Sequence, residues 1–338
     1  MTRFFYAVLL VGAMSLPVIS RACDLCGCFT PQVAEPQVQT TRPGFYSGVS
    51  EQFTRFGTMQ FEGDEVPNPT GQYLNSSITQ LFAGYEINER FALQLTLPII
   101  DREFKRPEGF AIDHGSESGI GDMSILLRTV GFKYSSGGGR TFDVSGKNPV
   151  AIEHEPDFTF SAVLLTGLKF PTGDTSRLEE EFHEIEIPGA PESGIHGHDL
   201  TLGTGSYDGI FGEQNSFRYK NIFLETNLQF TLRGDGAHQY HFANDLTWSG
   251  GPGYYFLRKE TIAGIEFEIS GEYKDVDRFR GKPADDTGIT SVFLGPRIVL
   301  SHGRWSAELT GEFPISIDNT SLQAVPDYRI RGGFSFHF

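Results

Sequence analysis

Hydrophobic and polar residues alternate with a period of two over most of the chain after Gly44. From Ile265 to Ile269, for example, apolar residues alternate with Glu266 and Glu268. Such a pattern is typical of a β-strand with one apolar face and one polar face. It fits both a soluble sandwich and a membrane barrel with a polar interior.

Strand length separates these two architectures. Several of the alternating segments exceed ten residues. Sandwich strands average about 5–6 residues, whereas a tilted strand needs about 9–11 residues to cross a bilayer. The sequence therefore predicts an all-β fold, an antiparallel transmembrane β-barrel of about 12 strands, with 10–14 left open. The segments lie at about residues 44–57, 76–87, 90–103, 119–133, 157–171, 198–211, 217–232, 239–250, 261–274, 288–302, 304–317 and 327–338.

Connection lengths support the barrel, since outer-membrane barrels pair short periplasmic turns with long outer loops. Residues 88–90 and 302–304 form short connections. The pattern predicts long polar loops at 58–75, 104–118, 172–197, 275–287 and 318–326. Two connections break the alternation, because 134–156 is long and 233–238 is short.

Composition excludes two other classes of protein. The 338 residues carry a formal net charge of -16, which argues against nucleic acid as a partner because phosphate binding needs a basic face. Mean hydropathy is -0.24, and no apolar run of about 18 residues follows the N-terminal segment, so a bundle of membrane helices is not expected. A barrel stays compatible because alternation dilutes its apolar residues.

The N-terminal residues 1–22 have the features of a signal peptide. Arg3 is followed by an apolar stretch, and Ser20 and Ala22 are the small residues of a cleavage site. We therefore expect export, a tail at residues 23–43 in the periplasm, and a barrel at residues 44–338 in the outer membrane of a Gram-negative bacterium.

The chain ends in alternating aromatic and polar residues. Phe334, Phe336 and Phe338 alternate with Ser335 and His337. This ending resembles the signal that the barrel assembly machinery reads on outer-membrane proteins. The expected partners are therefore this machinery, outer-membrane lipid and a small-molecule solute. The sequence does not specify an oligomeric state.

Three glycine-rich motifs resemble one known family. They are GIGD at residues 119–122, LKFPTGD at 168–174 and LGTGSYD at 202–208. They are similar to segments of the outer-membrane β-barrel transporters labelled MetA-pathway of phenol degradation. The resemblance covers most of residues 44–338 and implies a channel, or porin, for small aromatic or apolar solutes. It assigns no ligand-binding residue.

Three cysteines form a second local motif. Cys23, Cys26 and Cys28 have C-x-x-C-x-C spacing within the sequence CDLCGC, which resembles the start of some exported Gram-negative barrels. Two or three thiolates could share one soft ion, so a single copper or zinc ion is a candidate cofactor. A fourth ligand is missing. A disulfide with one spare thiol, or a lipid on Cys23, are the alternatives.

Charged residues of both signs occupy the polar face of the predicted strands. Inside a barrel they would pair across strands, because an unpaired buried charge is costly. They could also tune the selectivity of a pore. The predicted lumen-lining charges are Asp122, Arg128, Lys169, Glu225, Glu266, Glu268, Glu272, Arg297, Glu308, Glu312, Arg329 and Arg331.

The sequence leaves three functions open. The first is an outer-membrane channel for passive passage of small solutes, and the second is a metal-handling barrel that uses the cysteine tail. The third is a structural barrel that does not conduct. His196 and His198 are a weaker candidate ligand pair. No sequence motif of a hydrolase, metalloprotease or nucleotide-binding enzyme is present, so an enzyme is not expected.

Overall fold

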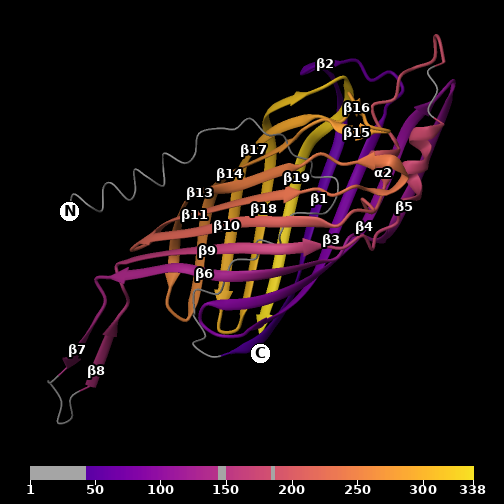
Figure 1. The fold of residues 1–338 in the computed structure, drawn as a ribbon. Coiled ribbons are helices and arrows are strands. Elements are labelled where there is room, and N and C mark those ends of the chain that lie inside the picture. Colours follow the sequence, from indigo (N-terminus) through magenta and orange to yellow (C-terminus); the bar gives the residue numbers. More distant parts are fainter. Residues whose placement is uncertain (1–42, 144–149, 184–186) are drawn as a thin grey trace, which may run out of the picture.

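A computed structural model of the chain describes residues 43–143, 150–183 and 187–338. In these residues, twelve strands form one closed antiparallel barrel, as predicted (Figure 1). Neighbours around the ring are β19-β18-β17-β14-β13-β11-β10-β9-β6-β4-β3-β1, and β1 pairs with β19 to close it. No helix in these residues is both long and apolar enough to span a membrane.

The barrel strands vary in length and carry additional short elements. The ring consists of β1 (Gly44–Phe61), β3 (Tyr73–Glu86), β4 (Phe91–Glu108), β6 (Ser124–Ser136), β9 (Phe158–Lys169), β10 (Asp208–Tyr219), β11 (Ile222–Leu232), β13 (Asp245–Arg258), β14 (Thr261–Lys274), β17 (Ile289–His302), β18 (Trp305–Asn319) and β19 (Leu322–His337). The short elements are β2 (Asp64–Val66), β5 (Ala111–Ile120), β7 (Gly139–Asp143), β8 (Val150–His154), η1 (Ser176–Phe182), α2 (Gly197–Leu200), η2 (Ala237–Gln239), β12 (Tyr240–His241), β15 (Asp277–Phe279) and β16 (Lys282–Ala284).

Alternation sorts the side chains of each strand between two environments. On β14, Phe267 is 54% exposed on the outside, whereas its neighbours Glu266 and Glu268 are each 2% exposed and point inward. On β9, Leu164 is exposed and Leu165 is buried. The exterior is therefore largely apolar, and many charges lie inside.

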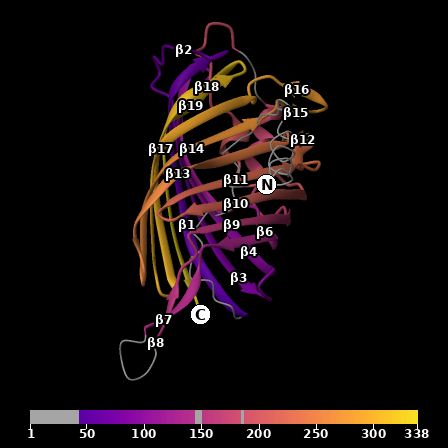
Figure 2. The ribbon, with the colours of Figure 1, turned by 90° about the vertical axis from the view of Figure 1, so that its left-hand side faces the viewer.

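The two ends of the barrel differ, as the predicted connection lengths require. At the end that carries the C-terminus, residues 220–221, 259–260 and 303–304 are tight turns (Figure 1). We call this the turn end and the opposite one the loop end. The exception is the long connection after β6, where β7 and β8 form a hairpin that projects away from the barrel (Figure 2).

Three loops at the loop end pack on one another, and we call their described residues the loop cap: 170–183 with 187–207, 233–244, and 275–288. Leu178, Tyr240 and Phe242 are buried together, with Phe279 against them. A second buried cluster joins Ile195 and Leu200 of the first loop to the inner faces of β1, β3 and β4 through Phe56, Leu74 and Phe104. The cap is thus anchored inside the barrel wall.

Several predicted strand boundaries were wrong. The segment 198–211 begins in α2, and its strand, β10, starts only at Asp208. Residues 217–232 contain a hairpin turn in which Lys220 has a positive φ of 53°. The predicted loop 318–326 is a two-residue turn between β18 and β19, and the predicted loop 104–118 is a hairpin of β4 and β5.

A close approach of β17 and β18 supplies a test of this packing. Gly295 points inward on β17, and a Cβ there would overlap the Gly311 carbonyl group, whereas a Cβ on Gly311 would meet nothing within 4 Å. Gly295→Ala should therefore lower the free energy of unfolding by about 1–3 kcal/mol. Gly311→Ala is the matched control and should leave the urea midpoint nearly unchanged. Equal midpoints for the two variants would contradict this register.

Candidate functional site: the barrel interior

The inner wall carries a cluster of acidic and basic side chains from five strands, β11, β14, β17, β18 and β19, with β13 between β11 and β14 in the ring. We call it the charged cluster. Cross-strand pairing brings these side chains together, because Glu266 lies opposite Arg297 and Glu312 lies opposite Arg329 in the strand register. Its members are Glu225, Glu266, Glu268, Glu272, Arg297, Glu308, Glu312, Arg329 and Arg331.

Arg297 is the centre of this cluster. Its Nη1 lies 2.8 Å from Glu225 Oε2 and 2.7 Å from Glu266 Oε2. Its Nη2 lies 2.6 Å from Glu308 Oε2, and its Nε is 3.7 Å from Glu268 Oε2. One guanidinium group therefore pairs with carboxylates from three strands. It can do so because the N–H donors of its planar group point in several fixed directions.

Two further arginines on β19 extend the cluster. Arg331 contacts Glu268 and donates from Nε to Glu312 Oε2 at 3.1 Å. Arg329 lies farther from its nearest carboxylates, with Nη2 3.7 Å from Glu272 Oε2, and its guanidinium is 3.9 Å above the centre of the Phe293 ring.

The wall across the ring from the charged cluster carries an apolar patch between polar and cationic side chains. Strands β4, β6, β9 and β10 stand opposite β14, β17, β18 and β19 in the ring order. Their inward side chains include Ile100, Leu126, Leu165 and Ile210, all of them buried. The interior thus has the charged cluster on one side and this apolar patch on the other.

The three family-like motifs meet at the loop end in a separate network of buried charges. Lys169 Nζ lies 2.7 Å from Asp122 Oδ2 and 2.7 Å from Asp208 Oδ2. Arg233 Nη1 continues the chain at 3.0 Å from Asp208, and its Nε donates to Asp245 at 2.6 Å. We call this the rim network, since it ties the first turns of the loop cap to the ends of five neighbouring strands, β6, β9, β10, β11 and β13.

Glycines in the same motifs allow the backbone to approach this network. A Cβ on Gly203 would lie 2.8 Å from Asp122 Oδ1, and one on Gly173 would lie 2.5 Å from the Leu202 carbonyl oxygen. The backbone N–H groups of Gly173 and Thr204 each donate to Asp122 at 2.9 Å. These motifs therefore have a structural explanation, because they bury and satisfy one carboxylate.

His198 is buried within the loop cap and contacts two of its loops. Its Nδ1 is 3.0 Å from Glu181 Oε1, and its ring stacks on those of His196 and Tyr240. Burial lowers the pKa of His198, but Asp199, Glu181 and, at longer range, Asp286 together raise it well above the usual value. Although burial raises the pKa of Glu181, His198 lowers it to about 2.

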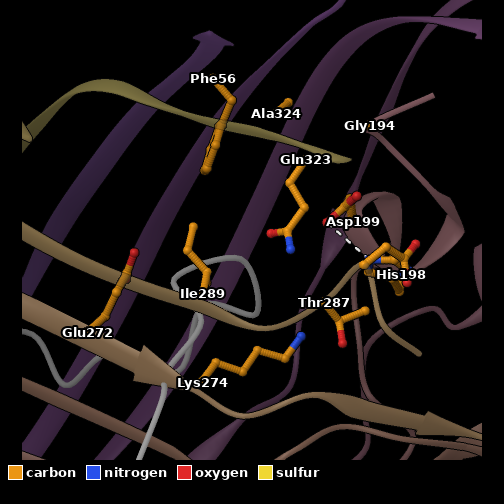
Figure 3. A pocket seen from close by; sticks show the side chains of 11 residues that line it. Phe56, Gly194, His198, Asp199, Glu272, Lys274, Thr287, Ile289, Gln323 and Ala324 are labelled. Carbon is orange, nitrogen blue, oxygen red and sulfur yellow. Dashed lines mark ion pairs between the residues drawn. The ribbon is translucent and has the colours of Figure 1, made fainter. Parts of the chain in front are cut away.

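A small pocket separates the loop cap from the charged cluster. It encloses about 430 Å³ of empty space, part of it open to solvent. Figure 3 shows the polar ends of Gln323, Lys274 and Thr287 between Ile289 on one side and His198 on the other. Glu272 belongs to both the pocket and the charged cluster, so the two features are continuous.

The structure groups the twelve predicted lumen charges in three places. Nine of them form the charged cluster, and Asp122 and Lys169 belong to the rim network. Arg128 lies apart, opposite Ala92 towards the turn end. Sequence reasoning missed Arg102 and Arg106 on β4, which hold backbone carbonyl groups of the loop cap. Their inward position in the alternation was the available signal.

The metal hypothesis gains no site in the described part of the chain. There, no group of three or more His, Cys, Asp or Glu side chains is arranged to hold a metal ion. His196 and His198, the weaker predicted pair, each contact carboxylates: His196 Nε2 is 3.3 Å from Asp286. The Cys23, Cys26 and Cys28 motif lies outside the described residues.

The C-terminal aromatics lie on the closing strand. Phe334 is exposed on the outer face of β19. The rings of Phe336 and Phe338 contact each other, with their centroids 5.2 Å apart. The Phe338 N–H donates to the Phe45 carbonyl at 2.8 Å, so the last residue still takes part in barrel closure.

The chain matches no protein-family model and no curated protein. Among solved structures, it is similar to the COG4313 outer membrane channel from Pseudomonas putida F1, with 12% identity, 90% of this chain and 99% of that chain covered, and a TM-score of 0.57. It also matches the β domain of the Bordetella autotransporter BrkA, with 10% identity, coverage of 88% and 100%, and a TM-score of 0.43. The first similarity defines the class of fold, a closed 12-stranded antiparallel barrel.

The ion pairs of His198 should make the loop cap sensitive to pH. Because the folded-state pKa is raised, the stabilisation is complete below the pKa of an unfolded histidine, about 6.5. It is lost as the pH rises through the folded-state value. Protease cleavage within residues 170–207 should therefore accelerate at alkaline pH, and His198→Gln should remove this pH dependence. The same alkaline acceleration in the variant would assign the effect to another group.

Proposed function

We propose that the chain is an outer-membrane channel for passive passage of small solutes. The observation that carries the proposal is the inverted distribution of polarity, with apolar side chains outside the barrel and charges inside. In water such an exterior would be an aggregation surface, whereas a bilayer requires it. Closure of the sheet also supports a location in a bilayer, because a closed barrel leaves no strand edge unpaired in lipid.

Aromatic side chains gather on the outer surface near the turn end. Barrels carry such girdles at the membrane–water interface, where amphipathic rings are stable. This placement supports a turn end at one membrane interface, and its short turns favour the periplasmic one. The exposed aromatics here are Phe45, Tyr85, Phe91, Phe132, Tyr134, Phe217, Tyr219, Tyr254, Phe256 and Phe334.

Polar atoms on the inner wall support a hydrated interior. The Ser50 and Ser76 hydroxyls are buried and have no hydrogen-bond partner among the described residues, and the same holds for Glu266 Oε1. Buried polar groups are normally satisfied by protein or by ordered water. Water inside the barrel would therefore complete their hydrogen bonding, which favours a channel over a filled structural barrel.

The solute class rests on two further supports. The COG4313 protein is named as a channel, and the motifs of the transporter-like family imply small aromatic or apolar solutes. The apolar patch of the interior, at Leu126 and Leu165, would suit such molecules. The barrel assembly machinery as partner, through Phe334, Phe336 and Phe338, and the periplasmic position of the tail belong to the same proposal.

Channel activity can be tested with purified protein in planar lipid bilayers. We expect discrete conductance steps in KCl, because the polar wall should hold a continuous aqueous path. A barrel of confirmed fold that gives no steps above the protein-free baseline, and no solute uptake into liposomes, would favour the non-conducting alternative.

The lipid-facing surface can be tested on a single strand. Leu95 and Asp101 both point outward from β4 and both are exposed. Leu95→Arg should lower the free energy of unfolding in lipid by about 2–4 kcal/mol if this position faces the bilayer core. Asp101→Arg, three outward positions farther towards the loop end, is the matched control and should cost much less. Similar losses at both positions would contradict the membrane assignment.

A further inference from the structure

The charged cluster contains more acidic than basic side chains. It contains six glutamates and three arginines, and each arginine contacts at least two of the glutamates. The cluster therefore holds three more carboxyl groups than guanidinium groups. The hydroxyls of Ser270 and Ser291 donate to Glu312 and Glu272, but they supply no charge.

One atom of the cluster still offers an acceptor to the interior. Glu266 is 2% exposed, and its Oε2 pairs with Arg297 at 2.7 Å. Its Oε1 is buried and has no hydrogen-bond partner among the described residues. A buried carboxylate oxygen in this state is stabilised by a donor from outside the cluster, and a cationic donor would also offset the excess charge.

Cationic side chains elsewhere on the inner wall lie towards its two ends. Arg102, Arg106 and Lys169 are at the loop end and bind carboxylates or backbone carbonyls there. Arg218 is near the turn end and donates to two backbone carbonyls. Arg128 also lies towards that end, opposite Ala92. The contacts of Arg102, Arg106, Lys169 and Arg218 named here are thus with groups outside the charged cluster.

From this asymmetry we propose that the channel selects positively charged small solutes, in particular cations with an apolar body such as aromatic amines. The cationic group would pass along the charged cluster, and the apolar body would lie against Leu126, Leu165 and Ile210 on the wall across the ring. The proposal rests on the channel function and adds the charge of the solute. An excess of fixed negative charge in a narrow polar path raises the local concentration of cations and excludes anions.

Ion selectivity is the first test, and it needs no variant. With a KCl gradient across a planar bilayer, the reversal potential of the wild-type channel should show potassium permeating more readily than chloride. Absence of conductance would overturn the channel function itself. Conductance with a reversal potential at zero, or of the opposite sign, would overturn the present inference and leave the channel function in place.

A variant links that preference to the cluster. Glu225→Gln with Glu268→Gln removes two charges of the cluster and keeps side chains of the same shape. The permeability ratio of potassium to chloride should then fall by roughly tenfold or to near unity. Asp101→Asn with Glu103→Gln on the outer face of β4 makes the same change in net charge and should leave the ratio unchanged. An equal fall in both double variants would show that the interior cluster is not responsible.

A matched pair of solutes tests the organic part of the proposal. Benzylammonium and benzoate have similar size and opposite charge, so liposome uptake should favour benzylammonium in the wild type and lose this preference in the Glu225→Gln/Glu268→Gln variant. Because that variant alters ion pairs of Arg297, its barrel fold is checked by circular dichroism and heat-modifiable migration. Equal uptake of the two solutes by the wild type would overturn the proposal.

Discussion

Hydrogen bonding between the first and last strands is the constraint on which the structure depends. Pairing of β1 with β19 runs from Tyr46↔His337 to Phe61↔Leu322 and turns an open sheet into a ring. A closed ring has no free strand edge, so its backbone groups are satisfied without water. It also gives the sheet an inside and an outside, and the period of two then places each side chain in one or the other.

The interior differs around the ring because different strands contribute different residues. Charges come from the strands near the C-terminal half, with Arg297 at their centre, and apolar side chains such as Leu126 come from the strands across from them. At the loop end, the rim network and His198 hold the cap against the wall. The proposed permeation path therefore has a fixed cap, a charged side and an apolar side.

Alternation made the barrel predictable from the sequence, because Phe267 and Glu266 must lie on opposite faces of any strand that contains both. Strand boundaries were less predictable where glycine and polar residues dominate. Residues 198–207 alternate weakly, yet the turn after His196 is stabilised by a capping contact with Asp199, and the strand starts later. Turn chemistry decided the structure there, and the alternation was misleading.

Partners within the site were not predictable, since they depend on register between distant strands. Asp122, Lys169 and Asp208 belong to three separate motifs. The pairing of their strands brings Lys169 Nζ to 2.7 Å from a carboxylate oxygen of each aspartate. The contact of Arg297 with Glu225 joins residues 72 positions apart. Sequence analysis identified the inward face of these strands, but it offered no means of assigning pairs along it.

The central claim is that lipid lies outside the barrel and water inside. Spin labels placed one at a time at positions 265 to 269 on β14, in a background with the three tail cysteines replaced by serine, test it directly. Accessibility to oxygen, which concentrates in lipid, should be high at Ile265, Phe267 and Ile269 and low at Glu266 and Glu268. A polar nickel chelate should give the opposite pattern or be excluded. Accessibility without this two-residue alternation, or with its phase reversed, would contradict the account.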